Sequence, residues 1–149
     1  MSDRDEIEEV LHAYATHLDK KTPAALADEV FTHDAVIDLG YGVWEGPERF
    51  VKEYSWELEQ FDGTAHVLTN FRCQIDGDTA SSSIYVTAWH WSKGSAEKER
   101  FPTSDFVTIG VYLDKLRRDP QGWRIAHRRF RRLGPSALAI GAMPDFIDV

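Results

Sequence analysis

The sequence predicts a single domain of the α+β class, with helices in its first half and strands in its second. Its 149 residues are enough for one hydrophobic core. Apolar residues recur every three or four positions as far as Phe61, and an alternating pattern typical of strands begins at Thr64. Helices followed by a run of strands are typical of α+β folds, in which the helices cover one face of an antiparallel sheet.

Three helices are predicted before Thr64. Ser2 begins the first and Gly46-Pro47 the third, whereas Pro23 begins the second, which ends near Phe31, because serine caps helices and proline is favoured in the first turn. The positions expected to face inward are Ile7, Val10, Leu11, Tyr14 and Leu18 in the first helix, Leu26 and Val30 in the second, and Val51, Tyr54, Leu58 and Phe61 in the third.

The second half predicts two β-hairpins, preceded by a short strand over Val36–Leu39. Lys93–Arg100 is a charged loop between the hairpins. The predicted hairpin strands are Thr64–Ile75 and Thr79–Trp91, which turn at Asp76-Gly77-Asp78, and Pro102–Arg117 and Gly122–Arg131, which turn around Asp119-Pro120-Gln121-Gly122.

Helices that cover the concave face of a curved sheet leave a cavity between the two layers, and such places favour ligand binding. The core domain is expected over roughly residues 5–132, and residues 133–149 form an apolar tail rich in glycine and proline. We expect this tail to cover the mouth of the pocket or a neighbouring subunit. The whole chain, 1–149, is one domain in this interpretation.

Composition excludes several classes of function. The formal net charge of −8 is against nucleic-acid binding, and strand alternation divides the basic run after Ala126 between two faces. Cys73 is the only cysteine, so neither an internal disulfide nor a multi-cysteine zinc site is expected. The acidic N-terminus is unlike a signal peptide, and no apolar run approaches the ~20 residues that span a bilayer. A cytoplasmic location without membrane contact follows.

Two polar residues of the first helix are candidates for chemistry. Tyr14 lies on the apolar stripe, so its hydroxyl needs either a ligand or a backbone partner in the core. Asp19 lies at the end of the helix, where the dipole favours cations. A residue that is locally unfavourable suggests a functional role, although Lys20 and Lys21 would also offset a solvated end charge.

His66 and His90 lie in the two strands of the first predicted hairpin. If Asp76, Gly77 and Asp78 all belong to the loop, His66 faces Ala88 and His90 is its diagonal neighbour on the same face. A two-residue turn would place the histidines on opposite faces. His66 is expected on the face opposite Phe71, and a lone strand histidine is more often structural than catalytic.

Arg128 is the basic residue that strand alternation separates from Arg129 and Arg131. Burial of an unpaired guanidinium is very costly. Arg128 is therefore expected to meet a carboxylate, a ligand or water.

Five segments together resemble one known family. They are Tyr14-Ala-Thr-His-Leu-Asp19, Phe31-Thr-His-Asp34-Ala, Trp44-Glu-Gly46-Pro47, Ala65-His66-Val-Leu-Thr-Asn70 and Gly122-Trp123-Arg-Ile125-Ala-His-Arg128. In order and spacing they resemble the SnoaL-like branch of the nuclear transport factor 2-like superfamily. The resemblance implies a cone-shaped, cystatin-like fold, with a curved mixed or antiparallel sheet covered by three N-terminal helices.

The resemblance also implies site residues. Asp19 and His66 match the aspartate and histidine of scytalone dehydratase, bile-acid dehydratase and hexachlorocyclohexane dehydrochlorinase. Tyr14 matches a polar position that lines the pocket, Arg128 a pocket arginine of the dehydrochlorinase, and His90 a second active-site histidine of scytalone dehydratase. No one of these enzymes has the whole set.

These matches imply a cofactor-independent and metal-independent lyase or isomerase that acts on a small, largely apolar cyclic substrate. His66 would be the base, Asp19 would orient it, Tyr14 or His90 would donate a proton, and Arg128 would neutralise negative charge. The related lyases suggest a trimer and other members of the fold a dimer, so a homo-oligomer is expected.

Three alternatives stay open. The first is a non-catalytic ligand-binding or assembly subunit, and the second is a ketosteroid-isomerase-like or polyketide cyclase activity on the same fold. The third and least favoured is a metal site formed by His66, His90 and Asp19.

Overall fold

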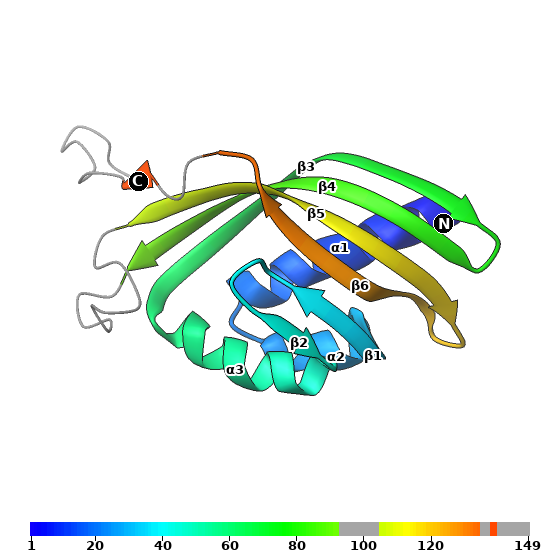
Figure 1. The fold of residues 1–149 in the computed structure, drawn as a ribbon, viewed down its shortest axis with the longest axis horizontal. Helices are drawn as coiled ribbons and strands as arrows, with labels where there is room; N and C mark the ends of the chain where they lie inside the picture. Colours follow the sequence, from blue (N-terminus) through cyan, green and yellow to red (C-terminus); the bar gives the residue numbers. More distant parts are fainter. Residues whose placement is uncertain (93–104, 135–137, 140–149) are drawn as a thin grey trace.

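Helices pack against the concave face of a strongly curved sheet (Figure 1). A computed structural model of the chain describes residues 1–92 and 105–134 and the backbone of 138–139. The helices are α1 (Asp3–Asp19), the short 3-10 helix η1 (Pro23–Ala25), α2 (Leu26–Glu29) and α3 (Pro47–Glu59). The strands are β1 (Phe31–Asp38), β2 (Val43–Glu45), β3 (Phe61–Asp76), β4 (Thr79–Ser92), β5 (Phe106–Asp119), β6 (Gly122–Arg132) and β7 (Leu138–Ala139).

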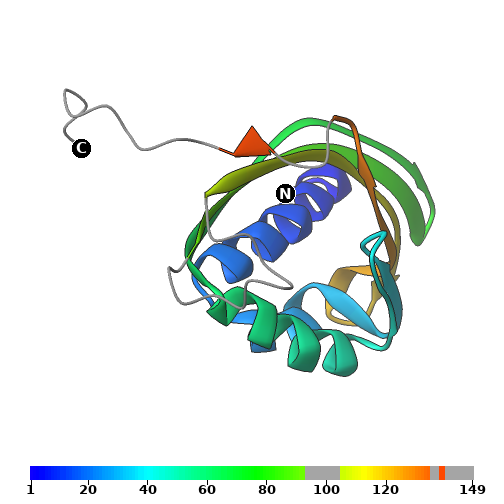
Figure 2. The same ribbon diagram turned by 60° about the vertical axis from the view of Figure 1, so that its left-hand side comes forward.

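The sheet is mixed, with the strand order β2-β1-β6-β5-β4-β3. β1 and β6 run parallel, whereas β3, β4, β5 and β6 form an antiparallel series. β7 pairs with the part of β5 that lies beyond the end of β6. In Figure 2, α1 lies in the hollow of the curved sheet and α3 runs along the open side of that hollow. The predicted α+β architecture is confirmed.

The first helix forms as the sequence predicts. Ser2 accepts a hydrogen bond from the backbone N–H of Asp5, and the Asp5 carboxylate accepts one from the backbone N–H of Ser2. The predicted stripe is fully buried at Ile7, Leu11 and Leu18, where it faces the sheet. This packing places the C-terminal end of α1 against the start of β3. No helix in the described part of the chain is long and apolar enough to cross a bilayer.

The segment after the second helix differs from the prediction. That helix ends at Glu29, and β1 begins at Phe31 rather than at Val36. The pairing of β1 with β6 is irregular between Phe31 and Val36, so the alternation that marks a strand is interrupted there. β2 was not predicted, because it has only three residues and depends on its pairing with β1.

The turn of the first hairpin also differs from the prediction. Asp76 pairs with Thr79, so the turn has two residues, and Gly77 adopts a φ of 56°. This φ lies in the left-handed region, which suits glycine. Alone, a turn of this length would place His66 and His90 on opposite faces of the sheet.

A bulge at Asn70 reverses this effect. Asn70 adopts a φ of 58°, and the register of the β3–β4 pair shifts by one residue there. His66 is therefore opposite Ala88, as predicted, and His90 lies on the same face. Phe71, expected on the other face, packs against the core instead, because the extra residue changes the alternation. The predicted turn was one residue too long and the bulge was not predicted, and these two errors cancel at His90.

The second hairpin confirms the prediction from Phe106 to Arg131, with a turn at Pro120-Gln121. The predicted loop Lys93–Arg100, the predicted strand start at Pro102 and most of the tail 133–149 lie outside the described residues. Within that tail, Leu138–Ala139 forms β7.

Gly110→Ala is expected to destabilise the fold by about 1–3 kcal/mol, because overpacking forces neighbours apart. A Cβ at Gly110 would overlap the Phe130 ring and lie 2.7 Å from the carbonyl oxygen of Arg131. Gly63→Ala is the matched control, since its Cβ would lie 3.7 Å from Trp91, and it should change stability by less than about 0.5 kcal/mol. Urea unfolding measures both, and equal losses would show that Gly110 is not closely packed.

Candidate active site

A cavity of about 430 Å³ lies between the helices and the concave face of the sheet. Its wall is rich in aromatic side chains, namely Tyr14, Tyr41, Tyr54, Phe61, Phe106, Tyr112 and Phe130. A volume of this size suits a small organic molecule, and a mainly apolar wall with few polar groups is typical of ligand sites.

A hydrogen-bonded Asp19–His66 pair joins α1 to β3 at this cavity. Asp19 Oδ1 is 2.7 Å from His66 Nδ1, and Oδ2 accepts a 3.0 Å hydrogen bond from the backbone N–H of His66. The Thr64 hydroxyl donates to Oδ1 at 3.0 Å. The side chain of His66 is only 3% exposed. The predicted contact between the two side chains is therefore confirmed.

The Asp19 carboxylate is ionised at neutral pH. Burial raises its pKa, but the hydrogen bonds from His66 and Thr64 outweigh this effect and leave the pKa below its usual range. An ionised acceptor at Nδ1 favours the His66 tautomer that carries its proton on Nδ1. The lone pair of Nε2 is then available to a ligand in the cavity that His66 lines.

His90 lines the same cavity, as predicted from its side of the strand. Its ring stacks on Phe106 with the centroids 4.2 Å apart, and it lies 6.1 Å from the ring of His66. Burial, and then the charge of His66, lower the pKa of His90 to about 4. His90 is therefore neutral at neutral pH, and it is not a source of positive charge for a ligand.

Tyr14 contributes a buried hydroxyl to the cavity wall. The residue is fully buried, and its Oη makes no hydrogen bond of good geometry to the residues that the structure describes, although the side chains of Arg128 and Tyr112 lie close enough to affect its pKa. A buried polar atom without a partner is costly, so a ligand atom is a natural partner for it. The alternative that Tyr14 is a core tyrosine bonded to the backbone is not what the described residues show.

Arg128, which was expected at the ligand, is not among the residues that line the cavity. It is fully buried and donates two hydrogen bonds to Asp114, from Nε at 2.8 Å and from Nη2 at 2.7 Å. The expected carboxylate partner is thus present. Residue spacing places Arg128 on the inner face but does not reveal Asp114, its partner on the next strand.

Several polar groups of the cavity were missed in the sequence, among them Glu57 and Arg132. Glu57 is 8% exposed, and its carboxylate accepts a 2.7 Å hydrogen bond from the Tyr41 hydroxyl. Burial of the hydroxyl end raises the pKa of Tyr41, although the residue as a whole is 64% exposed, and the negative charge of Glu57 raises this pKa further. Glu57 precedes Leu58 and follows Tyr54 by three positions on the inner stripe of α3, and this spacing was the available signal. Arg132 also lines the cavity.

The proposed three-residue metal site is not assembled in the described part of the chain. No group of three histidine, cysteine, aspartate or glutamate side chains there is close enough to hold a metal ion. His66 uses Nδ1 for Asp19, and His90 packs against Phe61 and Phe106.

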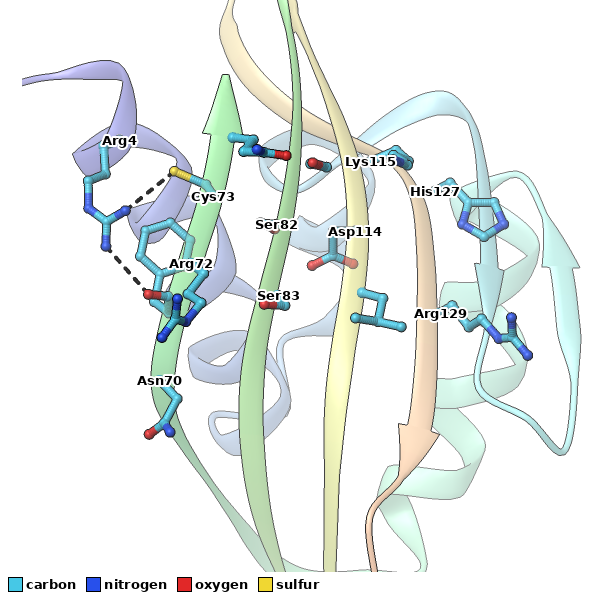
Figure 3. Close-up of a pocket in the computed structure, with 14 residues that line it drawn as sticks. Arg4, Asn70, Arg72, Cys73, Ser82, Ser83, Asp114, Lys115, His127 and Arg129 are labelled. Atoms are coloured by element: carbon cyan, nitrogen blue, oxygen red, sulfur yellow. Dashed lines mark hydrogen bonds between the residues drawn. The ribbon is translucent and has the colours of Figure 1, made fainter. Parts of the chain in front are cut away.

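A second, more open hollow of about 1070 Å³ crosses strands β3 to β6 (Figure 3). Its wall is polar and includes Arg72, Ser83, Lys115 and Arg129. None of the predicted site residues lines it, so the aromatic cavity is the candidate active site.

His90 gives the fold a pH dependence that its replacement should remove. Between pH 6.5 and about 4, an unfolded chain binds a proton at residue 90 and the native chain does not, so stability falls as the pH falls. His90→Phe should abolish this loss, on the order of 1–3 kcal/mol. Urea unfolding at pH 7 and pH 5 measures it, with the exposed His127→Phe as control. The same pH slope in His90→Phe and wild type would contradict the assignment.

Comparison with known proteins places the chain in a family. The SnoaL-like domain matches residues 1–129. An uncharacterized protein of Mycobacterium tuberculosis strain H37Rv (Rv2910c) is 36% identical over 131 residues, which are 86% of this chain and 84% of that protein.

Solved structures share the fold. A candidate aromatic ring hydroxylase from Novosphingobium aromaticivorans is 29% identical, with a TM-score of 0.80 and 93% of each chain covered. A candidate scytalone dehydratase from the same organism is 22% identical, with a TM-score of 0.76 and 96% of this chain and 94% of that chain covered. The predicted cystatin-like, nuclear transport factor 2-like fold is confirmed. The chain belongs to the SnoaL-like domain family.

Proposed function

We propose that the protein is a cofactor-independent lyase or isomerase that removes a carbon-bound proton from a small, largely apolar cyclic substrate. The observation that carries this proposal is the 2.7 Å hydrogen bond between Asp19 and His66 at the wall of an aromatic cavity. A histidine with an oriented, unprotonated nitrogen in an apolar site is suited to general-base catalysis.

In this mechanism His66 Nε2 takes the proton, and Asp19 stabilises the imidazolium that forms. Asp19 also holds the ring in place, because its two oxygens bind both the side chain and the backbone of His66. The low pKa of Asp19 keeps its negative charge opposite the developing positive charge.

Removal of the proton places negative charge on the substrate, either on an enolate oxygen or on a leaving oxygen. Tyr14 is the proposed donor to that oxygen, because its hydroxyl is buried at the cavity wall without a partner among the described residues. His90 is neutral at neutral pH, so its proposed role is that of a neutral hydrogen-bond partner. Elimination of the leaving group gives a dehydratase, and return of the proton to another carbon gives an isomerase.

The likeness in fold to the candidate scytalone dehydratase supports the lyase class. The alternatives of a ketosteroid-isomerase-like or polyketide cyclase activity use the same cavity with other substrates. A homo-oligomer is proposed as well, and exposed apolar side chains on the outer side of the sheet, among them Tyr85, Trp89 and Ile109, offer a surface for it.

His66→Ala should lower turnover by about 10²–10⁴-fold, because it removes the general base. Asp19→Asn should be severely impaired too, since it removes the charge and the preferred tautomer. The double variant should be little worse than either single one, because the two residues act as a unit. Turnover is measured on a panel of cyclic hydroxy-ketones, steroids and halogenated rings, with folding checked by circular dichroism.

The exposed His127→Ala is the matched control and should keep wild-type turnover. Losses that add in the double variant would show that Asp19 and His66 act independently. Ligand binding without turnover by the wild type across the panel would favour the alternative of a binding subunit.

A further inference from the structure

Below the cavity wall, the structure holds a buried ion pair that the proposed mechanism does not use. The side chains of Asp114 on β5 and Arg128 on β6 are both 0% exposed and are joined by two hydrogen bonds. Figure 3 shows Asp114 on its strand. A buried pair of charges is costly to desolvate and is not by itself evidence of stability. Its retention next to the cavity therefore suggests a role in the site.

The guanidinium of Arg128 lies against two tyrosine rings of the cavity wall. Its Cζ is 4.1 Å from the ring centroid of Tyr14 and 4.2 Å from that of Tyr112. The two rings meet edge to face, with centroids 5.6 Å apart and an angle of 76°. These contacts restrict the orientation of Tyr14, and they place a positive charge next to its phenol.

Both charges of the Asp114–Arg128 pair change the pKa of the Tyr14 hydroxyl. Burial raises the pKa of Tyr14, the positive charge of Arg128 lowers it, and the negative charge of Asp114 raises it. Arg128 is in direct contact with the ring, whereas Asp114 contacts the guanidinium. The effect of the cation on the hydroxyl is therefore the larger of the two.

We propose that the Asp114–Arg128 pair is a positioning unit for Tyr14, which fixes its ring and strengthens its hydroxyl as a hydrogen-bond donor to a ligand oxygen. This inference rests on the proposed function, in which Tyr14 faces the reacting oxygen. It replaces the expected direct contact of Arg128 with the substrate by an action through Tyr14. It also narrows the ligand class to cyclic molecules that carry an acceptor oxygen opposite Tyr14, such as a ketone or its enolate.

The test is a pH titration of Tyr14 in the ligand-free protein by ¹⁹F NMR with 3-fluorotyrosine. The chain has five tyrosines, and Tyr14→Phe identifies the signal. Asp114→Asn should lower the Tyr14 pKa, because it removes only the charge that raises it. The double variant Arg128→Met with Asp114→Asn should raise it by about one unit, because it removes the stronger, lowering charge as well.

The opposite signs of these shifts separate an electrostatic role from a purely structural one. Arg129→Met is the matched control, since it removes the neighbouring, outward-facing arginine and should leave the Tyr14 pKa unchanged. Buried ion pairs replaced as a whole are often tolerated, so the double variant carries the test even if Asp114→Asn does not fold. An unchanged or lowered Tyr14 pKa in the double variant would overturn the proposal.

A binding measurement connects the titration to the ligand class. The wild type should bind 1-indanone more tightly than indane. The double variant should lose part of this preference, and Tyr14→Phe should lose more of it than the double variant does. Equal preference in the wild type and the double variant would contradict the proposal. Neither measurement requires turnover, so a negative result in both would leave the proposed roles of Asp19 and His66 unaffected. Conversely, a wild type that shows the expected Tyr14 pKa shifts but no turnover would count against the proposed function alone.

Discussion

The carboxylate of Asp19 connects the last residue of α1 to the beginning of β3 through hydrogen bonds from Thr64 and from both the ring and the backbone of His66. This connection determines where His66 lies relative to the helix that carries Tyr14. An aspartate at a helix C-terminus is unfavourable for the dipole, and these donors compensate for that placement. The His66 ring that Asp19 orients is one of the few polar groups in the cavity wall.

A second polar interaction, between Asp114 and Arg128, lies behind the tyrosine rings of the cavity wall. It faces the rings of Tyr14 and Tyr112 rather than the cavity itself. Asp19 thus binds the basic residue His66 at the cavity wall. Asp114 binds the cationic residue Arg128, which lies against the rings of Tyr14 and Tyr112. In the proposed mechanism, this arrangement separates the proton acceptor, His66, from the hydrogen-bond donor, Tyr14, and proton removal from carbon uses both groups.

The sequence predicted the residues that depend on local patterns. The stripe of α1 placed Tyr14 inward, and the unfavourable position of Asp19 marked it as a candidate. His90 was placed on the correct face although the turn was misjudged, because no local pattern reveals the bulge at Asn70 that restores the register. The Asp19–His66 pair was expected only because the family resemblance implied it, and other partners on separate strands or helices could not be read from spacing. The pairing of Arg128 with Asp114 depends on tertiary register.

The tautomer of His66 tests the account most directly, because every proposed step requires a proton on Nδ1 and a free Nε2. Two-dimensional ¹⁵N NMR of the imidazole nitrogens at neutral pH measures it, with His66→Gln to identify the signals among the six histidines. We expect a protonated Nδ1 and an unprotonated Nε2 in the wild type, and loss of this preference in Asp19→Asn. A wild-type His66 that carries its proton on Nε2 would contradict it.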